Sequence, residues 1–226
     1  MKATAIVMAV ALACGVPLAN ALTRNANPDI RVVPPSALPD VAQQQSNDLL
    51  LHECGNGTMY LYLEQEQGAR LVVLNVTDPA NIRLAASIDT GLTKTWDFVR
   101  PVSNTLELIQ FRDGSGSALL DLRNAKSPRV GNIQSSVAEP IRMLGSSAYL
   151  AVALRPQPVE PRAHDVQVVD TSSTTDLLAT VAGVTRMVER SETGTIFLLG
   201  SGGLTVIRRL DVEQRHAMEE LMKSHN

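Results

Sequence analysis

The stretch Leu71–Thr90, LVVLNVTDPANIRLAASIDT, decides how the rest of the chain is interpreted. It contains an apolar run that ends at Asn75, a short polar segment around Asp78 and Pro79, and a second apolar run. Short runs rich in Val, Leu and Ile that are bounded by turn residues are typical of β-strands. The stretch therefore predicts two consecutive strands joined by a turn.

The same pattern returns along the chain at intervals of about 45 residues, which indicates an internal repeat. The runs that correspond to residues 71–75 are 118–121, 166–170 and 204–208. Two further strand-like runs precede each of these. The first runs of the four units are 49–52, 96–99, 141–144 and 185–188, and the second runs are 58–63, 105–109, 148–152 and 195–199. Each unit therefore predicts up to four short antiparallel strands.

Four antiparallel strands in a repeat of this length are typical of one blade of a β-propeller. We expect an all-β, propeller-like fold of about four blades over residues 48–209, followed by a short C-terminal helix over residues 210–226. The central strands are continuous apolar runs rather than alternating ones, which favours blades that are covered on both faces. A two-sheet sandwich and a β-solenoid are the alternatives.

Asn75, Asp121 and Asp170 each end the third strand of a unit. A side-chain oxygen at such a position accepts a hydrogen bond from the backbone two residues further on and fixes the turn. We therefore expect a structural role for these three residues, with metal binding as the alternative.

The first residues have the layout of a secretory signal peptide. Lys2 precedes the small apolar residues 3–18, and Ala19–Ala21 offers a cleavage point after Ala21. We therefore expect a signal peptide over residues 1–21 and export to the bacterial periplasm or the extracellular space. Residues 11–14 loosely resemble a lipobox, so a lipoprotein anchored through Cys14 is the alternative.

Residues 22–47 are expected to form an N-terminal segment and linker. Within this segment, residues 29–33 are strand-like, and the fourth unit lacks an outer strand of its own. We expect residues 29–33 to pair with residues 204–208, because this pairing would cover an exposed sheet edge. A disordered N-terminal segment is the alternative.

The stretch Leu71–Ser87 resembles the LVIVD repeat of bacterial exported and surface proteins, whose pattern is LxIxDVSDPxxPxLVGS. The matching residues are Leu71, Val73, Asn75, Val76, Thr77, Asp78, Pro79, Leu84 and Ser87. Asn75 replaces the usual Asp, and Ile82 replaces the second Pro. The copy over residues 119–131 keeps the Asp, the second Pro and the Gly but lacks the Asp-Pro pair.

The resemblance covers residues 48–208 and implies a propeller-type fold and an exported location, but no particular activity. Most propellers of this kind have more than four blades. The resemblance therefore leaves open whether four blades close alone or pair with a second copy of the chain.

Composition and motifs exclude several classes of function. The net charge is −3, the basic residues are scattered and aromatic residues make up 3 %, so nucleic-acid binding is not expected. No segment after the N-terminus is apolar enough to span a membrane. The turn Gly200–Gly203 lies between two strands and is expected to be a hairpin loop. His52 and Cys54 alone are too few ligands for a zinc site, so we expect no metal and no cofactor.

One set of polar residues occupies equivalent positions in the first strands of the four units. These residues are His52, Asp97, Arg142 and Arg186. The first strand of a blade lines the central channel of a propeller. The four side chains could form a ring that binds a small anion, or a salt-bridged plug.

The leading functional hypothesis is an exported, non-enzymatic binding module with a protein or cell-envelope partner, and with possible self-association. The alternative is a propeller-type hydrolase or lyase that acts at the channel mouth through His52 and Asp97.

Overall fold

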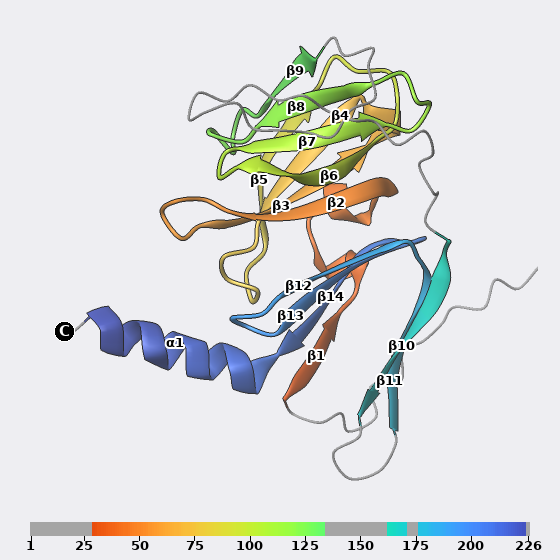
Figure 1. Cartoon of the computed structure of the whole chain (residues 1–226). Coiled ribbons are helices and arrows are strands. Elements are labelled where there is room, and N and C mark those ends of the chain that lie inside the picture. The colour runs from red at the N-terminus through yellow and green to blue at the C-terminus, as the bar shows by residue number, and fades with distance from the viewer. Residues whose placement is uncertain (1–28, 134–161, 171–175, 225–226) are drawn as a thin grey trace, which may run out of the picture.

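The computed structural model describes residues 29–133, 162–170 and 176–224. This part of the chain forms four antiparallel sheets and one helix (Figure 1). The predicted signal peptide lies outside the described residues, as do the runs 141–144 and 148–152. Export therefore stays a prediction.

Three sheets have four strands each, in an order that follows the predicted repeat. One contains β2 (Ser46–Glu53), β3 (Met59–Gln65), β4 (Arg70–Asn75) and β5 (Arg83–Asp89). The next contains β6 (Trp96–Ser103), β7 (Leu106–Phe111), β8 (Ser117–Asp121) and β9 (Arg129–Ile133). The third contains β12 (Arg186–Arg190), β13 (Thr195–Gly200), β14 (Gly203–Arg209) and β1 (Ile30–Val33). A separate hairpin consists of β10 (His164–Asp170) and β11 (Asp176–Val184).

The pairing of the N-terminal strand is the one expected from the sequence. β1 runs antiparallel to β14, with Val32 opposite Ile207 and Val33 opposite Val206. The short 3₁₀ helices η1 (Pro35–Ala37) and η2 (Asp40–Gln43) then lead into β2. Ala42 is fully buried in this connection, so the segment packs against the body of the protein.

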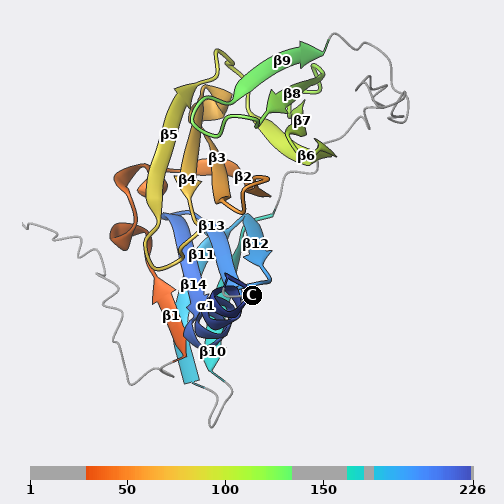
Figure 2. The ribbon, with the colours of Figure 1, turned by 90° about the vertical axis from the view of Figure 1, so that its left-hand side faces the viewer.

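The β2–β5 sheet lies between the other two four-stranded sheets (Figures 1 and 2). Its two faces contribute to different core clusters because side chains alternate along a strand. Leu61 and Leu63 pack in a cluster with Phe197 of β13, whereas Tyr62 packs in a cluster with Trp96 of β6. This burial on both faces explains why the central strands are continuous apolar runs.

The first two units share the same turn chemistry after their third strands. The Oδ1 atom of Asn75 accepts a hydrogen bond from the Thr77 N–H at 3.0 Å, and Oδ1 of Asp121 accepts one from the Arg123 N–H at 3.0 Å. The expected structural role is therefore confirmed for Asn75 and Asp121. The side chain of Asp170 lies outside the described residues.

The C-terminal helix α1 (Leu210–Ser224) is present where it was expected. None of the helices among the described residues has the length and apolar character needed to cross a membrane. The described sheets do not close into a ring, so the part of the chain that is described is an all-β stack with one helix (Figure 1).

Candidate functional site

A cluster of four charged side chains lies where the first strands of the three large sheets meet. β2 lies beside both β6 and β12. Asp48 comes from β2, Asp97 from β6 and Arg186 from β12, while Arg112 directly follows β7. We call these four residues the charged cluster.

Arg186 joins all three sheets. Its Nε donates to Oδ1 of Asp48 at 2.6 Å, and its Nη2 donates to Oδ1 of Asp97 at 2.9 Å. Arg112 donates to both carboxylate oxygens of Asp97, at 2.7 and 3.1 Å, and also to the backbone carbonyl of Asn47 at 2.9 Å. Forked contacts of this kind are the strongest that a guanidinium group makes.

Asp48 is the most deeply buried member of the charged cluster, with 2 % of its surface exposed. Its carboxylate also accepts the backbone N–H groups of Leu49 at 2.9 Å and Phe98 at 2.8 Å. Burial raises the pKa of Asp48, whereas Arg186 and the backbone donors act in the opposite direction. Two carboxylates and two guanidinium groups make the cluster electrically neutral.

The structure brings together two of the four residues that the sequence placed in a ring. Asp97 and Arg186 are in direct contact. His52 lies further along β2, opposite Tyr60, and its ring makes an edge contact with Tyr62 at a centroid distance of 6.3 Å. Burial lowers the pKa of His52. Arg142 lies outside the described residues.

Sequence reasoning missed Asp48 and Arg112. β2 begins at Ser46 rather than at Leu49, so Asp48 stands near the start of its strand as Asp97 does in β6. Asp48 is the third residue of β2 and Asp97 the second of β6, so an alignment of the strands on their starting residues does not match them either. Arg112 follows a strand in a loop, and no repeat position marks it.

Two buried carboxyl groups lie beside the charged cluster. Glu64 of β3 is fully buried, and Glu107 of β7 is 3 % exposed. Neither oxygen of Glu64 has a hydrogen-bond partner of good geometry among the described residues, although the Asn47 side chain lies close enough to act against the rise in its pKa. Burial dominates and raises the pKa of Glu64 to about 8 and that of Glu107 to about 7.

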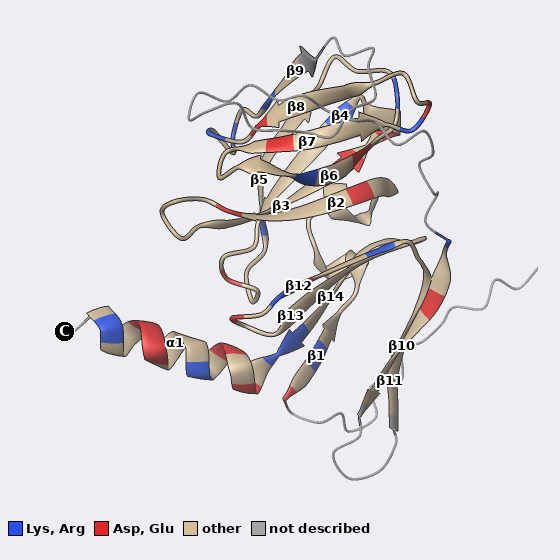
Figure 3. Ribbon diagram, in the orientation of Figure 1, with Lys and Arg blue, Asp and Glu red and all other residues tan. Residues whose placement is uncertain are grey.

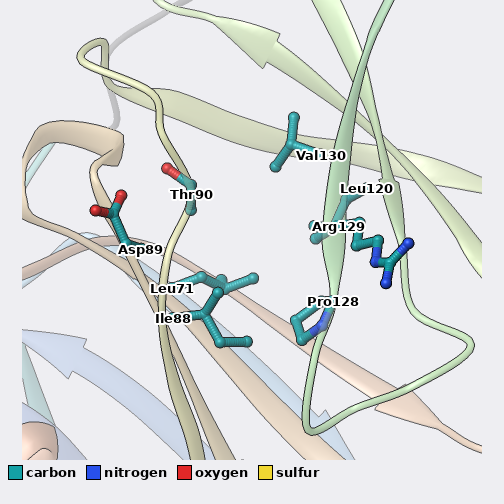
Figure 4. A pocket seen from close by; sticks show the side chains of 8 residues that line it. All are labelled: Leu71, Ile88, Asp89, Thr90, Leu120, Pro128, Arg129 and Val130. Carbon is teal, nitrogen blue, oxygen red and sulfur yellow. The ribbon is translucent and has the colours of Figure 1, made fainter.

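A separate pocket of about 300 Å³ opens between the outer strands of two sheets (Figure 4). Residues of β4, β5 and the adjoining turn form one wall, and residues of β8, β9 and the residue before β9 form the other. The lining residues are Leu71, Ile88, Asp89, Thr90, Leu120, Pro128, Arg129 and Val130. Aliphatic side chains and polar groups both line the walls, and Asp89 and Arg129 place one charge of each sign on them.

Within the described ranges, no three His, Cys, Asp or Glu side chains are grouped so that they could hold a metal ion. Comparison with models of known protein families, with curated proteins and with solved structures finds no match to this chain. The geometry of the charged cluster and of the pocket is therefore the basis for a functional proposal.

Proposed function

We propose that this protein is a non-enzymatic binding module on a propeller-like scaffold, and that it binds a small ligand with an apolar body and a charged end. The pocket between β4–β5 and β8–β9 carries the proposal. Its size lies at the lower end of the range for small-molecule sites, and its mixture of aliphatic walls and few polar groups is typical of such sites.

The repeat supports the propeller-like part of the proposal. Three four-stranded units stack so that the first lies between the second and the last. The last unit is completed by β1, and the first strands of the three units meet at the charged cluster. The neutrality of that cluster favours a structural role for it, because Arg112 and Arg186 already bind both carboxylates. His52 packs against Tyr62, whereas Asp97 pairs with Arg112 and Arg186. The two residues are not brought together, so the hydrolase or lyase alternative gains no support.

The walls of the pocket come from the third and fourth strands of two repeats. Leu71 pairs with Ile88 across the β4–β5 ladder, and Leu120 pairs with Val130 across the β8–β9 ladder. The two aliphatic pairs contribute opposite walls, so an apolar group between them would be shielded from water on both sides (Figure 4). Arg129 offers a donor for an anionic end group.

The proposal is tested with 8-anilinonaphthalene-1-sulfonate, a fluorescent probe that has an aromatic body and one sulfonate group. We expect saturable binding with one site. Val130→Trp fills the pocket and should weaken binding at least tenfold, and Arg129→Gln should weaken it about tenfold through the loss of a charge-assisted hydrogen bond. Both affinities are measured by fluorescence titration.

Val99→Trp is the matched control, because Val99 is 45 % exposed on β6 and is not part of the pocket lining. This variant should bind the probe as the unmodified protein does. Equal affinities of the Val130→Trp and Val99→Trp variants would show that the pocket is not the binding site.

A further inference from the structure

The interface between the β2–β5 and β6–β9 sheets contains two buried acids among apolar side chains. Glu64 lies two positions after Tyr62 on β3, and Glu107 lies two positions before Ile109 on β7. Residues two apart on a strand share a face. Tyr62 and Ile109 belong to the core cluster between these sheets, so both Glu side chains point into the same interface.

The positively charged side chains near these acids already form ion pairs with other carboxylates. Glu64 is influenced by Arg112, Asp48 and Asp97, and by the amide of Asn47, whereas Glu107 is influenced by Asp48. Arg112 holds Asp97, and Arg186 holds Asp48 and Asp97. Among the described residues, ionisation of Glu64 or Glu107 therefore adds a negative charge with no counter-ion of its own.

We propose that this interface is a proton-controlled joint, which is closed while Glu64 and Glu107 are protonated and loosens when they ionise. A carboxylate without a counter-ion needs water, and a fully buried carboxylate can reach water only if the packing around it opens. The β-sheets themselves keep their backbone hydrogen bonds, so the change is a separation of two sheets and not unfolding of the strands.

The joint adjoins the pocket. Glu64 pairs with Leu71 across β3 and β4, and Glu107 pairs with Leu120 across β7 and β8. Leu71 and Leu120 both line the pocket. Loosening of the joint would therefore widen the inner end of the pocket, but the joint does not depend on whether a ligand binds there.

The direction of the pH effect follows from burial. The pKa of Glu64 is raised to about 8 and that of Glu107 to about 7, from an ordinary value of 4.5. An acid with a raised pKa in the folded state favours that state at low pH, and this advantage is lost as the pH rises through the folded pKa. The joint is therefore closed below about pH 7 and loosens between about pH 7 and 8.

Trp96 provides a direct signal for the joint. It is the only tryptophan in the chain, it is fully buried, and it packs in the same core cluster. Emission of Trp96 and its quenching by iodide are measured from pH 5.5 to 9.5, together with far-ultraviolet circular dichroism. We expect a shift of emission to longer wavelength and stronger quenching, with a midpoint between about pH 7 and 8 and unchanged circular dichroism.

The pKa values of His52 and Tyr62, two other titratable groups in this region, are shifted away from this range. The pKa of His52 is lowered from 6.5, and the pKa of Tyr62 is raised from 10.0, in both cases mainly by burial. A transition between pH 7 and 8 can therefore be assigned to the two acids by substitution.

Glu64→Gln and Glu107→Gln keep the size of the side chains and remove the titration. The transition should lie near pH 7 in the Glu64→Gln variant and near pH 8 in the Glu107→Gln variant, and it should be absent in the double variant. Glu219→Gln, on the exposed face of α1, is the control and should behave as the unmodified protein. If one single variant fails to fold, the other still tests the joint.

Three results would overturn the proposal. The first is Trp96 emission and quenching that stay constant from pH 5.5 to 9.5. The second is a transition that persists in the double variant. The third is a loss of circular dichroism that accompanies the Trp96 signal, because this would indicate global unfolding and not separation of two sheets.

Discussion

At the scale of single residues, Arg186 is the side chain that links the three four-stranded sheets. Its guanidinium group contacts carboxylates from two other sheets. Asp48 is almost fully buried, so its negative charge depends on this partner and on two backbone N–H groups. Breaking a buried pair by removal of one member is far more damaging than the loss of an exposed pair.

We therefore expect Arg186→Ala to lower the free energy of unfolding by about 2–3 kcal/mol, somewhat less than for a fully buried pair because Arg186 is partly exposed. Arg123→Ala removes an equally close pair with Asp121, but Arg123 is 74 % exposed. That control should change stability far less than Arg186→Ala does, because water screens an exposed ion pair. Urea denaturation measures both, and similar values for the two variants would contradict a structural role for the charged cluster.

The same residues show what the sequence could and could not predict. Asp97 and Arg186 were found because they repeat at one position of successive units. The burial of Glu64 was not predictable, because it depends on the β6–β9 sheet, which is distant in sequence and covers β3. The sequence MYLYLEQ identifies the strand but gives no sign that its Glu lies in an interface.

At the scale of the elements, the connection between β3 and β4 passes very close to the backbone just before β6. Gly68 has a φ of +91°, in the region that favours glycine. Its carbonyl accepts a hydrogen bond from Trp96 Nε1 at 3.4 Å, and a Cβ atom at this position would lie 2.0 Å from the backbone oxygen of Lys94. The glycine therefore lets the β2–β5 sheet contact the start of β6.

We expect Gly68→Ala to destabilise the protein by more than about 3 kcal/mol, because backbone strain and a steric clash act together. Gly91→Ala is the control, since Gly91 has a similar φ of +70° but open space around it. It should show only the strain, about 1–2 kcal/mol. Thermal unfolding followed by Trp96 fluorescence measures the difference. If the two variants lose the same stability, the close approach to Lys94 is unimportant.

The elements were more predictable than their contacts. Local patterns and the repeat predict the strand-like runs, the pairing of residues 29–33 and the helix after residue 209. The start of β2 was placed three residues late, because Ser46, Asn47 and Asp48 are polar. Their burial against neighbouring sheets is a tertiary effect that overrides their local preference.

At the scale of the whole molecule, the sheets form a stack in which the β2–β5 sheet is central (Figures 1 and 2). In this stack the first repeat contacts both the second and the last, an arrangement compatible with a ring. Closure into a propeller depends on residues 134–161 and therefore stays a prediction. The helix α1 extends away from the stack, with acidic and basic residues interspersed along it (Figure 3).

The beginning of this helix is attached to the sheet that contains β1 and β14. Arg208 of β14 forms a salt bridge with Glu213 at 2.6 Å, and the backbone N–H of Leu210 donates to the carbonyl of Asp29. No residue of α1 is buried, and Leu221 is 62 % exposed. The far half of the helix therefore contributes little apolar burial to the stability of the stack.

A comparison of two leucines tests whether α1 unfolds independently of the sheets. Leu221→Ser should change the melting temperature of the stack by less than about 1 °C, because an exposed side chain loses little burial. Leu120→Ser, at a fully buried position of β8, should lower it by roughly 10 °C through lost burial and an unsatisfied hydroxyl. Calorimetry measures both shifts.

Hydrogen exchange gives the second readout for α1. Amides beyond residue 214 should exchange much faster than those of β3 and β4, because opening of a helix end that buries no residue needs little free energy. Slow exchange in that part of the helix, or a large shift in the Leu221→Ser variant, would mean that α1 packs against another surface in solution. The expected pattern would instead mean that α1 can unfold while the sheets and the charged cluster stay intact.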